Sequence, residues 1–345
     1  MIDARETARK LFLGSAFWSG MASLAAPFLA GAGSILMLHR INRSAGSPLG
    51  LNSHLTVSPD FLDQLLGELK RRGFTFVPLD DLLEGLTSGR RGMIAITADD
   101  GWLDNLTDAL PVFERHAAPF TVYVAPGLIT GAVAPWWEVV EEFCARGEIG
   151  RIVTACRAAG GKAAPGDSRR HLARTLACGV ARSIAEEDRQ AFLREAGALD
   201  ESSPRKFMNW DEVRRLTAHP LATIGAHTVH HYNLKRLPAE KALLEMTRSS
   251  AMIEAETGRR PQHFAYPYGF AEAVGPREIE LARQAGFRSA VTTRHGVLQA
   301  GHARHLHALP RISVNGNFQR LSYIRALLSG LTTPVVNRGR RLVTV

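Results

Sequence analysis

The stretch Met93–Gly101, with the sequence MIAITADDG, decides the fold class, because an apolar run passes directly into two carboxylates. A short continuous apolar run is typical of a strand that is buried on both faces of a parallel sheet. Similar runs recur along the chain and alternate with helical patterns. The expected strands cover residues 35–38, 74–77, 93–97, 120–124, 222–225, 263–266, 289–292 and 312–314. Strands and helices that alternate with short links predict an α/β fold with a parallel sheet or barrel.

The alternation stops between about residues 131 and 205. Helical patterns there cover residues 136–145, 169–181 and 186–196, and a link rich in Gly, Ala and Pro occupies residues 158–166. No convincing strand interrupts them. We therefore expect a helical insertion at about 131–205, lying across one end of a main domain that spans residues 34–318.

The amino-terminal residues are apolar. No charged side chain occurs from Leu11 to Leu38, directly after Arg9 and Lys10. A run of this length is long enough to span a membrane, and a charged start before an apolar stretch is also typical of a signal peptide. The Gly and Ser residues of the run and Pro27 favour a third interpretation. We expect residues 1–33 to form an apolar helix, over about 5–29, that packs on the domain or makes a peripheral membrane contact.

Positive charge is concentrated at the other end of the chain. Lys and Arg total 42 against 33 Asp and Glu, which gives a formal charge of +9, yet residues 281–345 hold ten Arg and no acidic residue. We expect a basic carboxyl-terminal helix and tail over 319–345, which either binds phosphate or a membrane or is simply solvated. No zinc-finger spacing or aromatic–basic interleaving accompanies it, so nucleic-acid binding is not expected.

The remaining composition is that of a folded globular protein, with 345 residues of which 45% are hydrophobic and 22% charged. It excludes wholesale disorder. Cys144, Cys156 and Cys178 are an odd number of cysteines without a CxxC pair, which argues against a disulfide framework. We expect reduced thiols and a cytoplasmic or membrane-associated location, with secretion less favoured.

Asp99 and Asp100 follow the strand expected at residues 93–97. Two adjacent carboxylates at the buried end of a strand are costly to ionise together without a cation. A divalent metal would hold one of them and leave the other to act as a base. The alternative interpretation is an Asx turn that caps the next helix.

Three histidines follow another expected strand, in the segment Gly225–His231 with the sequence GAHTVHH. His227 and His231 are four residues apart, so one helical turn would place both imidazoles on the same side. Two histidines and one carboxylate are a familiar set of ligands for a divalent metal. His230, between them, is expected to point elsewhere.

These motifs resemble those of a known family. Residues 97–101, TADDG, resemble the T-F-D-D-G signature of the polysaccharide deacetylases, also called the NodB homology domain or carbohydrate esterase family 4. Residues 227–231, HTVHH, resemble the family's H-S/T-x-x-H motif, and residues 266–269, YPYG, resemble its R-x-P-Y/F-G segment. Asn209–Asp211 also resembles the lead-in to the histidine motif. The resemblance covers roughly residues 34–315 and is nearer to the poly-N-acetylglucosamine deacetylase-like branch.

The resemblance implies a distorted (β/α) barrel with about seven parallel strands. It also implies a metal-dependent hydrolase that removes acetyl groups from N-acetylglucosamine-type sugars, either chito-oligosaccharides or a surface polysaccharide, and releases acetate and a free amine. Asp100, His227 and His231 would bind the metal, which is expected to be zinc, with cobalt or nickel as alternatives. Asp99 would be the general base. Tyr268, through its backbone N–H, and Tyr266 would contact the substrate or the oxyanion.

The chain departs from the family pattern at two positions beside these motifs. Ala98 stands where a phenylalanine usually precedes the aspartate pair. Ala265 stands where the family has an arginine that orients the catalytic aspartate. Arg311 is the candidate to orient Asp99 in its place.

The general acid has two candidates, because the family's late leucine–histidine motif is only weakly matched by Leu306 and His307. His39 ends the first strand, which is where the poly-N-acetylglucosamine branch carries its acid, and we favour His39 over His307. The paired Trp136 and Trp137 open the insertion and either stack on sugar rings or pack in the core.

The sequence also permits a second class of function. The missing arginine and phenylalanine are consistent with a catalytically impaired carbohydrate-binding or polysaccharide-assembly protein on the same barrel. The complete set of two aspartates and two histidines argues against it. Acetate release in the presence of zinc or cobalt discriminates between the two.

Overall fold

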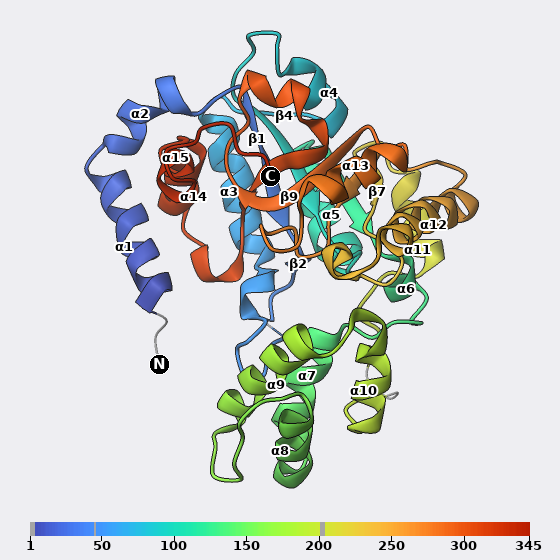
Figure 1. The fold of residues 1–345 in the computed structure, drawn as a ribbon. Coiled ribbons are helices and arrows are strands. Elements are labelled where there is room, and N and C mark those ends of the chain that lie inside the picture. The colour runs from blue at the N-terminus through green and yellow to red at the C-terminus, as the bar shows by residue number, and fades with distance from the viewer. Residues whose placement is uncertain (1–3, 45, 201–203) are drawn as a thin grey trace.

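The computed structural model describes residues 4–44, 46–200 and 204–345 (Figure 1). Among these residues, seven parallel strands form a closed barrel, because β1 pairs with β10 on one side and with β5 on the other. The barrel strands are β1 (Gly33–Leu38), β5 (Met93–Ala98), β6 (Phe120–Val124), β7 (Ala222–Ala226), β8 (His263–Ala265), β9 (Ser289–His295) and β10 (Leu309–Ser313). The predicted α/β barrel with about seven parallel strands is confirmed.

Three short strands complete the sheets. β4 (Thr75–Phe76) pairs with the beginning of β5, and β2 (Arg40–Ile41) pairs with β3 (Thr56–Val57) just beyond the end of β1. β10 begins three residues before the strand predicted at 312–314. This earlier start makes Arg311 a strand residue instead of a residue in the preceding loop.

Both faces of the barrel strands are buried, which explains their continuous apolar sequences. Along β5, Ile94 and Ile96 pack in the layer beneath the helices, whereas Met93 and Ala95 belong to a separate core with Tyr123. Tyr123 is fully buried and passes over Gly225, where an added Cβ would lie 2.4 Å from the tyrosine ring. Gly225 is therefore required by packing inside the barrel.

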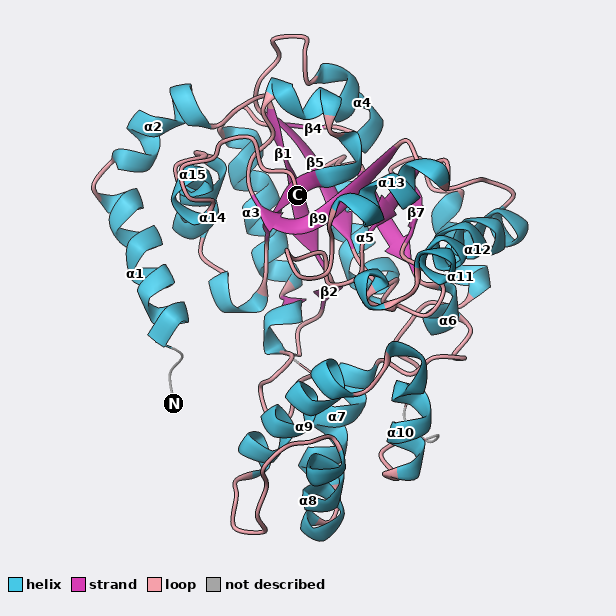
Figure 2. Cartoon of the chain, viewed as in Figure 1, coloured by secondary structure: helices cyan, strands magenta, loops and turns pink. Residues whose placement is uncertain are grey.

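Helices cover the outside of the barrel (Figure 2). Ser58 caps the first of them by accepting a hydrogen bond from the backbone of Phe61, and Pro59 occupies the first helical position. The helices are α3 (Pro59–Arg71), α4 (Leu79–Gly85), a π-helical turn at Asn105–Ala109 that continues into α5 (Leu110–Arg115), α6 (Pro126–Ile129), α11 (Trp210–Thr217), α12 (Ala239–Thr257), α13 (Pro276–Gln284), α14 (Leu321–Leu328) and α15 (Thr332–Val336). Short 3-10 turns lie at Ser53–Leu55, Glu186–Asp188, Leu234–Arg236, Ala300–Arg304, Leu306–Ala308 and Gly316–Phe318.

The segment between β6 and β7 extends away from the barrel as a group of helices (Figure 1). It contains α7 (Trp136–Arg146), α8 (Ile149–Ala158), α9 (Arg169–Ser183) and α10 (Arg189–Glu195), and has a hydrophobic core of its own. The sequence patterns predicted α7, α9 and α10 but not α8. Cys144 and Cys156 are buried here and Cys178 is exposed, all three as free thiols.

The amino-terminal region is two helices, and the single helix expected over about 5–29 is wrong. α1 (Ala4–Trp18) and α2 (Met21–Leu29) are separated by Gly20, whose φ of 76° lies in the left-handed region that ends a helix. In the described part of the chain, no single helix is long and apolar enough to cross a membrane. Residues Glu6–Leu29 meet the length and composition criteria only as a pair of helices bent by 87°.

Candidate active site

A cavity of about 210 Å³ opens at the carboxyl ends of the barrel strands. Its walls come from segments far apart in the sequence: the ends of β1, β5, β7 and β9, the loop after β2, the segment after β8, and the start of the insertion. The lining residues are His39, Asn52, His54, Leu55, Asp99, Asp100, Trp136, Trp137, His227, His231, Tyr266, Tyr268 and Thr293. Parallel strands bring their carboxyl ends to the same edge, so side chains that follow different strands meet there.

The three predicted ligands, Asp100, His227 and His231, converge in this cavity. The Nε2 atoms of His227 and His231 each lie 3.3 Å from Oδ1 of Asp100. The three residues are buried, and they form a group whose ligand atoms all lie within 4.8 Å of one another. Two imidazole nitrogens and one carboxylate oxygen are a donor set that zinc and similar divalent metals accept, with positions left for water and substrate.

The spacing of His227 and His231 predicted a helical turn, and this prediction is wrong. Residues 227–233 form a loop after β7, and both Thr228 and His231 have left-handed backbone conformations, with φ of 60° and 57°. Asp100 and Tyr268 are also left-handed, so four of the six described non-glycine residues with positive φ lie at this site. Such conformations cost of order 1–3 kcal/mol each and cluster where function requires them.

The remaining ring nitrogens of the two histidines differ in their surroundings. Nδ1 of His227 lies 2.7 Å from the backbone oxygen of Ala265, and this contact directs Nε2 toward Asp100. Nδ1 of His231 is buried and has no hydrogen-bond partner among the described residues. Burial lowers the pKa of His231, which favours the neutral imidazole that a metal needs.

Asp100 is further oriented by Trp102, which was not among the predicted site residues. The indole Nε1 donates a hydrogen bond of 2.9 Å to Oδ2 of Asp100, leaving Oδ1 for the histidines. Burial raises the pKa of Asp100, but the contacts with His227 and His231 outweigh it, and the pKa lies well below its ordinary value. Asp100 is therefore ionised at neutral pH, as a candidate metal ligand must be.

Asp99 is held by Arg311 from β10. Nη1 and Nη2 of Arg311 each donate a hydrogen bond of 2.7 Å to a different carboxylate oxygen. The guanidinium also donates to Oγ1 of Thr97 and to the backbone oxygen of Thr292, so its position is fixed. Burial raises the pKa of Asp99, yet the charge of Arg311 outweighs it and the pKa lies below its ordinary value.

The two candidate acids are placed very differently. His39 lines the cavity, is about one-fifth exposed, and has its Nε2 3.9 Å from Oδ2 of Asp99. His307 precedes β10, at the amino end of the barrel, where its Nε2 lies 2.7 Å from the backbone oxygen of Phe287. The structure does not bring His307 to the cavity, because parallel strands hold their amino and carboxyl ends at opposite edges.

Tyr268 and Tyr266 both line the cavity, but their hydroxyl groups are engaged elsewhere. The hydroxyl of Tyr268 accepts hydrogen bonds from Nε1 of Trp136 and Nη1 of Arg189, at 2.8 and 3.0 Å, and burial raises its pKa to about 12. The hydroxyl of Tyr266 donates to the backbone oxygen of His307. Neither hydroxyl is therefore directed at a substrate, and only the backbone of these residues is left for that role.

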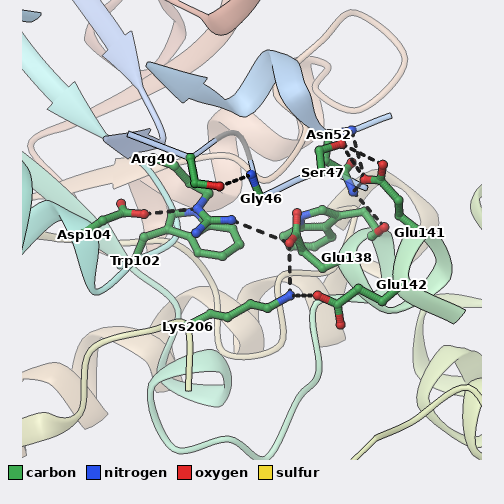
Figure 3. Close-up of polar contacts among 12 residues, drawn as sticks. Arg40, Gly46, Ser47, Asn52, Trp102, Asp104, Glu138, Glu141, Glu142 and Lys206 are labelled. Atoms are coloured by element: carbon green, nitrogen blue, oxygen red, sulfur yellow. Dashed lines mark hydrogen bonds and ion pairs between the residues drawn. The ribbon is translucent and has the colours of Figure 1, made fainter. Parts of the chain in front are cut away.

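The insertion completes the cavity and is fixed to the barrel by buried charges (Figure 3). Glu141 of α7 accepts hydrogen bonds from the side chain of Ser47 and from the backbone and side chain of Asn52, so it shapes the loop that carries Asn52 and His54 into the cavity. The loop's backbone at Leu49 and Leu51 also donates to Glu141.

A second set of contacts leads through Trp102 to Asp100, a candidate metal ligand. Arg40 bonds to Asp104, approaches Glu138 of α7, and lies over the ring of Trp102 at 4.5 Å (Figure 3). Lys206, beyond the insertion, pairs with Glu138 and Glu142. Asn52, His54, Trp102 and Arg189 were not predicted. Of these, only Trp102 had a local signal, since it directly follows the aspartate motif.

Comparison with known proteins agrees with this geometry. A family model described as polysaccharide deacetylase matches residues 188–290, which include the histidine motif and residues 266–269. No curated protein sequence matches the chain.

The fold is similar to those of several solved structures. The deacetylase PplD of Streptococcus pyogenes, in complex with acetate, is 17% identical with a TM-score of 0.58, covering 86% of this chain and 99% of that one. IcaB from Ammonifex degensii is 20% identical with a TM-score of 0.54, covering 86% and 98%. A de-N-acetylase from Aggregatibacter actinomycetemcomitans is 14% identical with a TM-score of 0.51, covering 85% and 98%. The chain therefore has the fold of these solved structures, and its residues 188–290 match the polysaccharide deacetylase family model.

Proposed function

We propose that this protein is a metal-dependent N-deacetylase that hydrolyses the acetamido group of an N-acetylglucosamine-type sugar in an oligo- or polysaccharide. The proposal rests on one observation: two neighbouring carboxylates in the same cavity have different partners. Asp100 faces two histidines, whereas Asp99, its neighbour in sequence, is held by Arg311 and kept ionised. One carboxylate is thus available as a ligand and the other as a base.

Asp100, His227 and His231 would hold the metal, which we propose to be zinc, with cobalt or nickel as alternatives. When bound, it would supply Lewis acidity to the amide carbonyl and to the attacking water. Asp99 accepts the proton of that water, and the bidentate contact with Arg311 keeps its carboxylate oriented while it does so.

His39 is the proposed general acid. It projects from the end of β1 into the cavity beside Asp99, where it can donate a proton to the leaving amine. The backbone N–H of Tyr268 is the proposed donor to the oxyanion. The reaction consumes one water molecule and yields acetate and a free amino sugar.

The size of the cavity favours a substrate that inserts one sugar ring at a time. A volume of about 210 Å³ is small, and Trp136 and Trp137 form one wall, where an indole face can stack on a pyranose ring. The acid on the first strand is the feature shared with the poly-N-acetylglucosamine branch. We therefore place a poly-N-acetylglucosamine-like surface polysaccharide ahead of chito-oligosaccharides.

The alternative, a catalytically impaired binding protein, rests on the missing arginine at position 265. Arg311 makes a two-point contact with the same aspartate from a different strand, so the loss at position 265 does not leave Asp99 without a partner. Ala98 is buried and removes no ligand. The departures from the family motif are therefore compatible with an active site.

The test is acetate release from a panel of acetylated glycans, measured on protein stripped of metal and then supplied with zinc, cobalt or nickel. We expect release only after metal addition, and only from glycans with an N-acetyl group. Tight metal binding without acetate release from any glycan would support the binding protein. A protein that binds no divalent metal would contradict both the ligand set and the reaction.

A further inference from the structure

Exposed large apolar side chains are concentrated near the two ends of the chain. Of the eleven large apolar side chains that are exposed among the described residues, six lie on α1 and α2 and three lie between Val335 and Leu342. The most exposed are Trp18, Phe28, Leu24 and Leu11, at 83, 78, 75 and 69%. Scattered apolar residues on a surface need no explanation, but a cluster of this kind marks an interaction site.

The two helices present these residues away from the protein. The buried residues Leu13, Ala16 and Ala22 face the domain, and α14 packs against both helices and against α15. Figure 1 shows α1 and α2 at the outer edge of the molecule, with α14 and α15 beside them. We call the exposed residues Leu11, Trp18, Met21, Leu24 and Phe28 the N-terminal apolar face.

The bend between the helices suits a flat partner. Two helices that meet at 87° define a plane, so both can lie in it at once. Helices with an apolar face and an exposed tryptophan typically lie in the interfacial layer of a bilayer, with the indole at the level of the headgroups. Neither helix alone is long and apolar enough to cross a membrane.

Positively charged side chains near this face favour a bilayer that contains anionic lipids. Arg91 donates a hydrogen bond to the backbone oxygen of Pro27, directly beside Phe28. Arg338, Arg340 and Arg341 are exposed in the tail after α15. Glu6, the one acidic residue from residue 4 to residue 59, is paired with Lys10. Exposed arginines next to an apolar face attract anionic headgroups, and each basic residue near such a surface adds roughly fivefold to binding.

We propose that the N-terminal apolar face and the arginines at 338, 340 and 341 dock this protein peripherally on an anionic lipid bilayer. Both contributions are required: the apolar side chains enter the interfacial layer, and the arginines bind phosphate headgroups. The proposal does not depend on the catalytic activity, because no residue of the cavity takes part in it.

The experiment is co-sedimentation of the full-length protein with vesicles of phosphatidylcholine, with or without phosphatidylglycerol. We expect binding to the anionic vesicles, weaker binding to the neutral ones, and release as salt concentration rises. The double variant Leu24→Ser/Phe28→Ser should bind at least about tenfold more weakly, because two exposed side chains no longer enter the bilayer. The matched control is Leu244→Ser, which changes an exposed leucine of α12 and should bind as the unaltered protein does.

The arginines are tested in the same assay. Arg338→Gln/Arg340→Gln/Arg341→Gln should reduce binding to anionic vesicles by roughly tenfold or more while changing little on neutral ones. The control removes three exposed arginines of the insertion, Arg170, Arg174 and Arg182, and should leave binding unchanged. All variants should retain their circular dichroism and their acetate release from a soluble substrate.

A spectroscopic signal reports on the face directly. The fluorescence of Trp18 should shift to the blue when anionic vesicles are added, and Trp18→Phe should abolish this shift. Equal binding by the double serine variant, or equal binding to neutral and anionic vesicles, would overturn the proposal. So would a dimer in light scattering that Leu24→Ser/Phe28→Ser abolishes while no vesicle binds, since the face would then belong to a second copy of the chain.

Discussion

Both ends of the barrel bring a histidine close to an aspartate. At the carboxyl end, Nε2 of His227 lies 3.3 Å from Asp100, and at the amino end Nε2 of His263 lies 3.4 Å from Asp80. At the amino end, however, the other ring nitrogen of His263 lies 2.9 Å from the hydroxyl of Ser289, and Arg288 pairs with Asp80. Both ring nitrogens of His263 and the carboxylate of Asp80 therefore have partners among the described residues.

The two ends also differ in their surroundings. Leu79, Leu82 and Leu83 of α4 pack with the core inside the barrel and close its amino end. At the carboxyl end, a second histidine and a second carboxylate join the pair, and the backbone is left-handed at four positions. A ring nitrogen of His231 is buried there without a hydrogen-bond partner among the residues that the structure describes. A histidine–carboxylate contact alone therefore does not identify a reactive site. The carboxyl end is distinguished by its cavity, by the left-handed backbone around that cavity, and by the unsatisfied ring nitrogen of His231.

The largest effect is expected for Asp99→Asn, which keeps the shape of the side chain and removes the proton acceptor. Turnover should fall by at least about 100-fold, because the water proton loses its base. Metal content, measured by atomic emission, should remain near that of the unaltered protein. Loss of metal in Asp99→Asn but not in Asp100→Asn would mean that the two carboxylates have exchanged roles.

His39 at the carboxyl end of the barrel and His307 at the amino end provide a matched pair of variants. His39→Ala should lower turnover by about 100-fold while the metal stays bound, since the leaving amine loses its proton donor. His307→Ala changes a histidine at the amino end that contacts only the backbone of Phe287, and should leave turnover within about twofold. Normal turnover in His39→Ala together with an inactive His307→Ala would reverse the assignment.

Arg311→Lys tests how the base is kept ionised. The two-point contact with Asp99 is lost while the positive charge remains, so we expect turnover to fall by about tenfold. The pKa of Asp99 lies below its ordinary value because of Arg311, and weakening that contact raises it. A carboxylate with a raised pKa is protonated at higher pH, so the acid limb of the kcat/KM profile should move upward. An unchanged acid limb would show that another group controls it.

The smallest effect on chemistry is expected at the amino end. His263→Gln should leave turnover of the folded protein within about twofold, and should lower the free energy of unfolding by roughly 1–3 kcal/mol, because buried partners lose a hydrogen bond. Urea denaturation measures the second quantity and acetate release the first. If turnover fell as in His39→Ala, the two ends would not be functionally distinct.

The sequence by itself predicted an α/β fold with parallel strands, and the resemblance of its motifs to a known family implied the barrel and most of the candidate site residues. Strands buried on both faces read as continuous apolar runs, and Asp99, Asp100, His227 and His231 follow such runs directly, so their common edge could be inferred from local pattern alone. The positions of β6 at Phe120–Val124 and of the insertion were predictable for the same reason. The turn that joins the two histidines was not, since left-handed conformations at Thr228 and His231 leave no mark in composition.

Only the tertiary structure decided the contacts that barrel closure creates. Arg311 reaches Asp99 across 212 residues because β1 lies between β5 and β10, and no periodicity encodes which strands become neighbours. The choice between His39 and His307 likewise follows from the opposite edges at which they emerge. Glu141 carries the loop with Asn52 and His54 into the cavity from the insertion, and Gly20 divides one apolar run into two helices. Local sequence sets which segments are strands and helices, whereas the pairing of distant segments is set by packing over the whole chain.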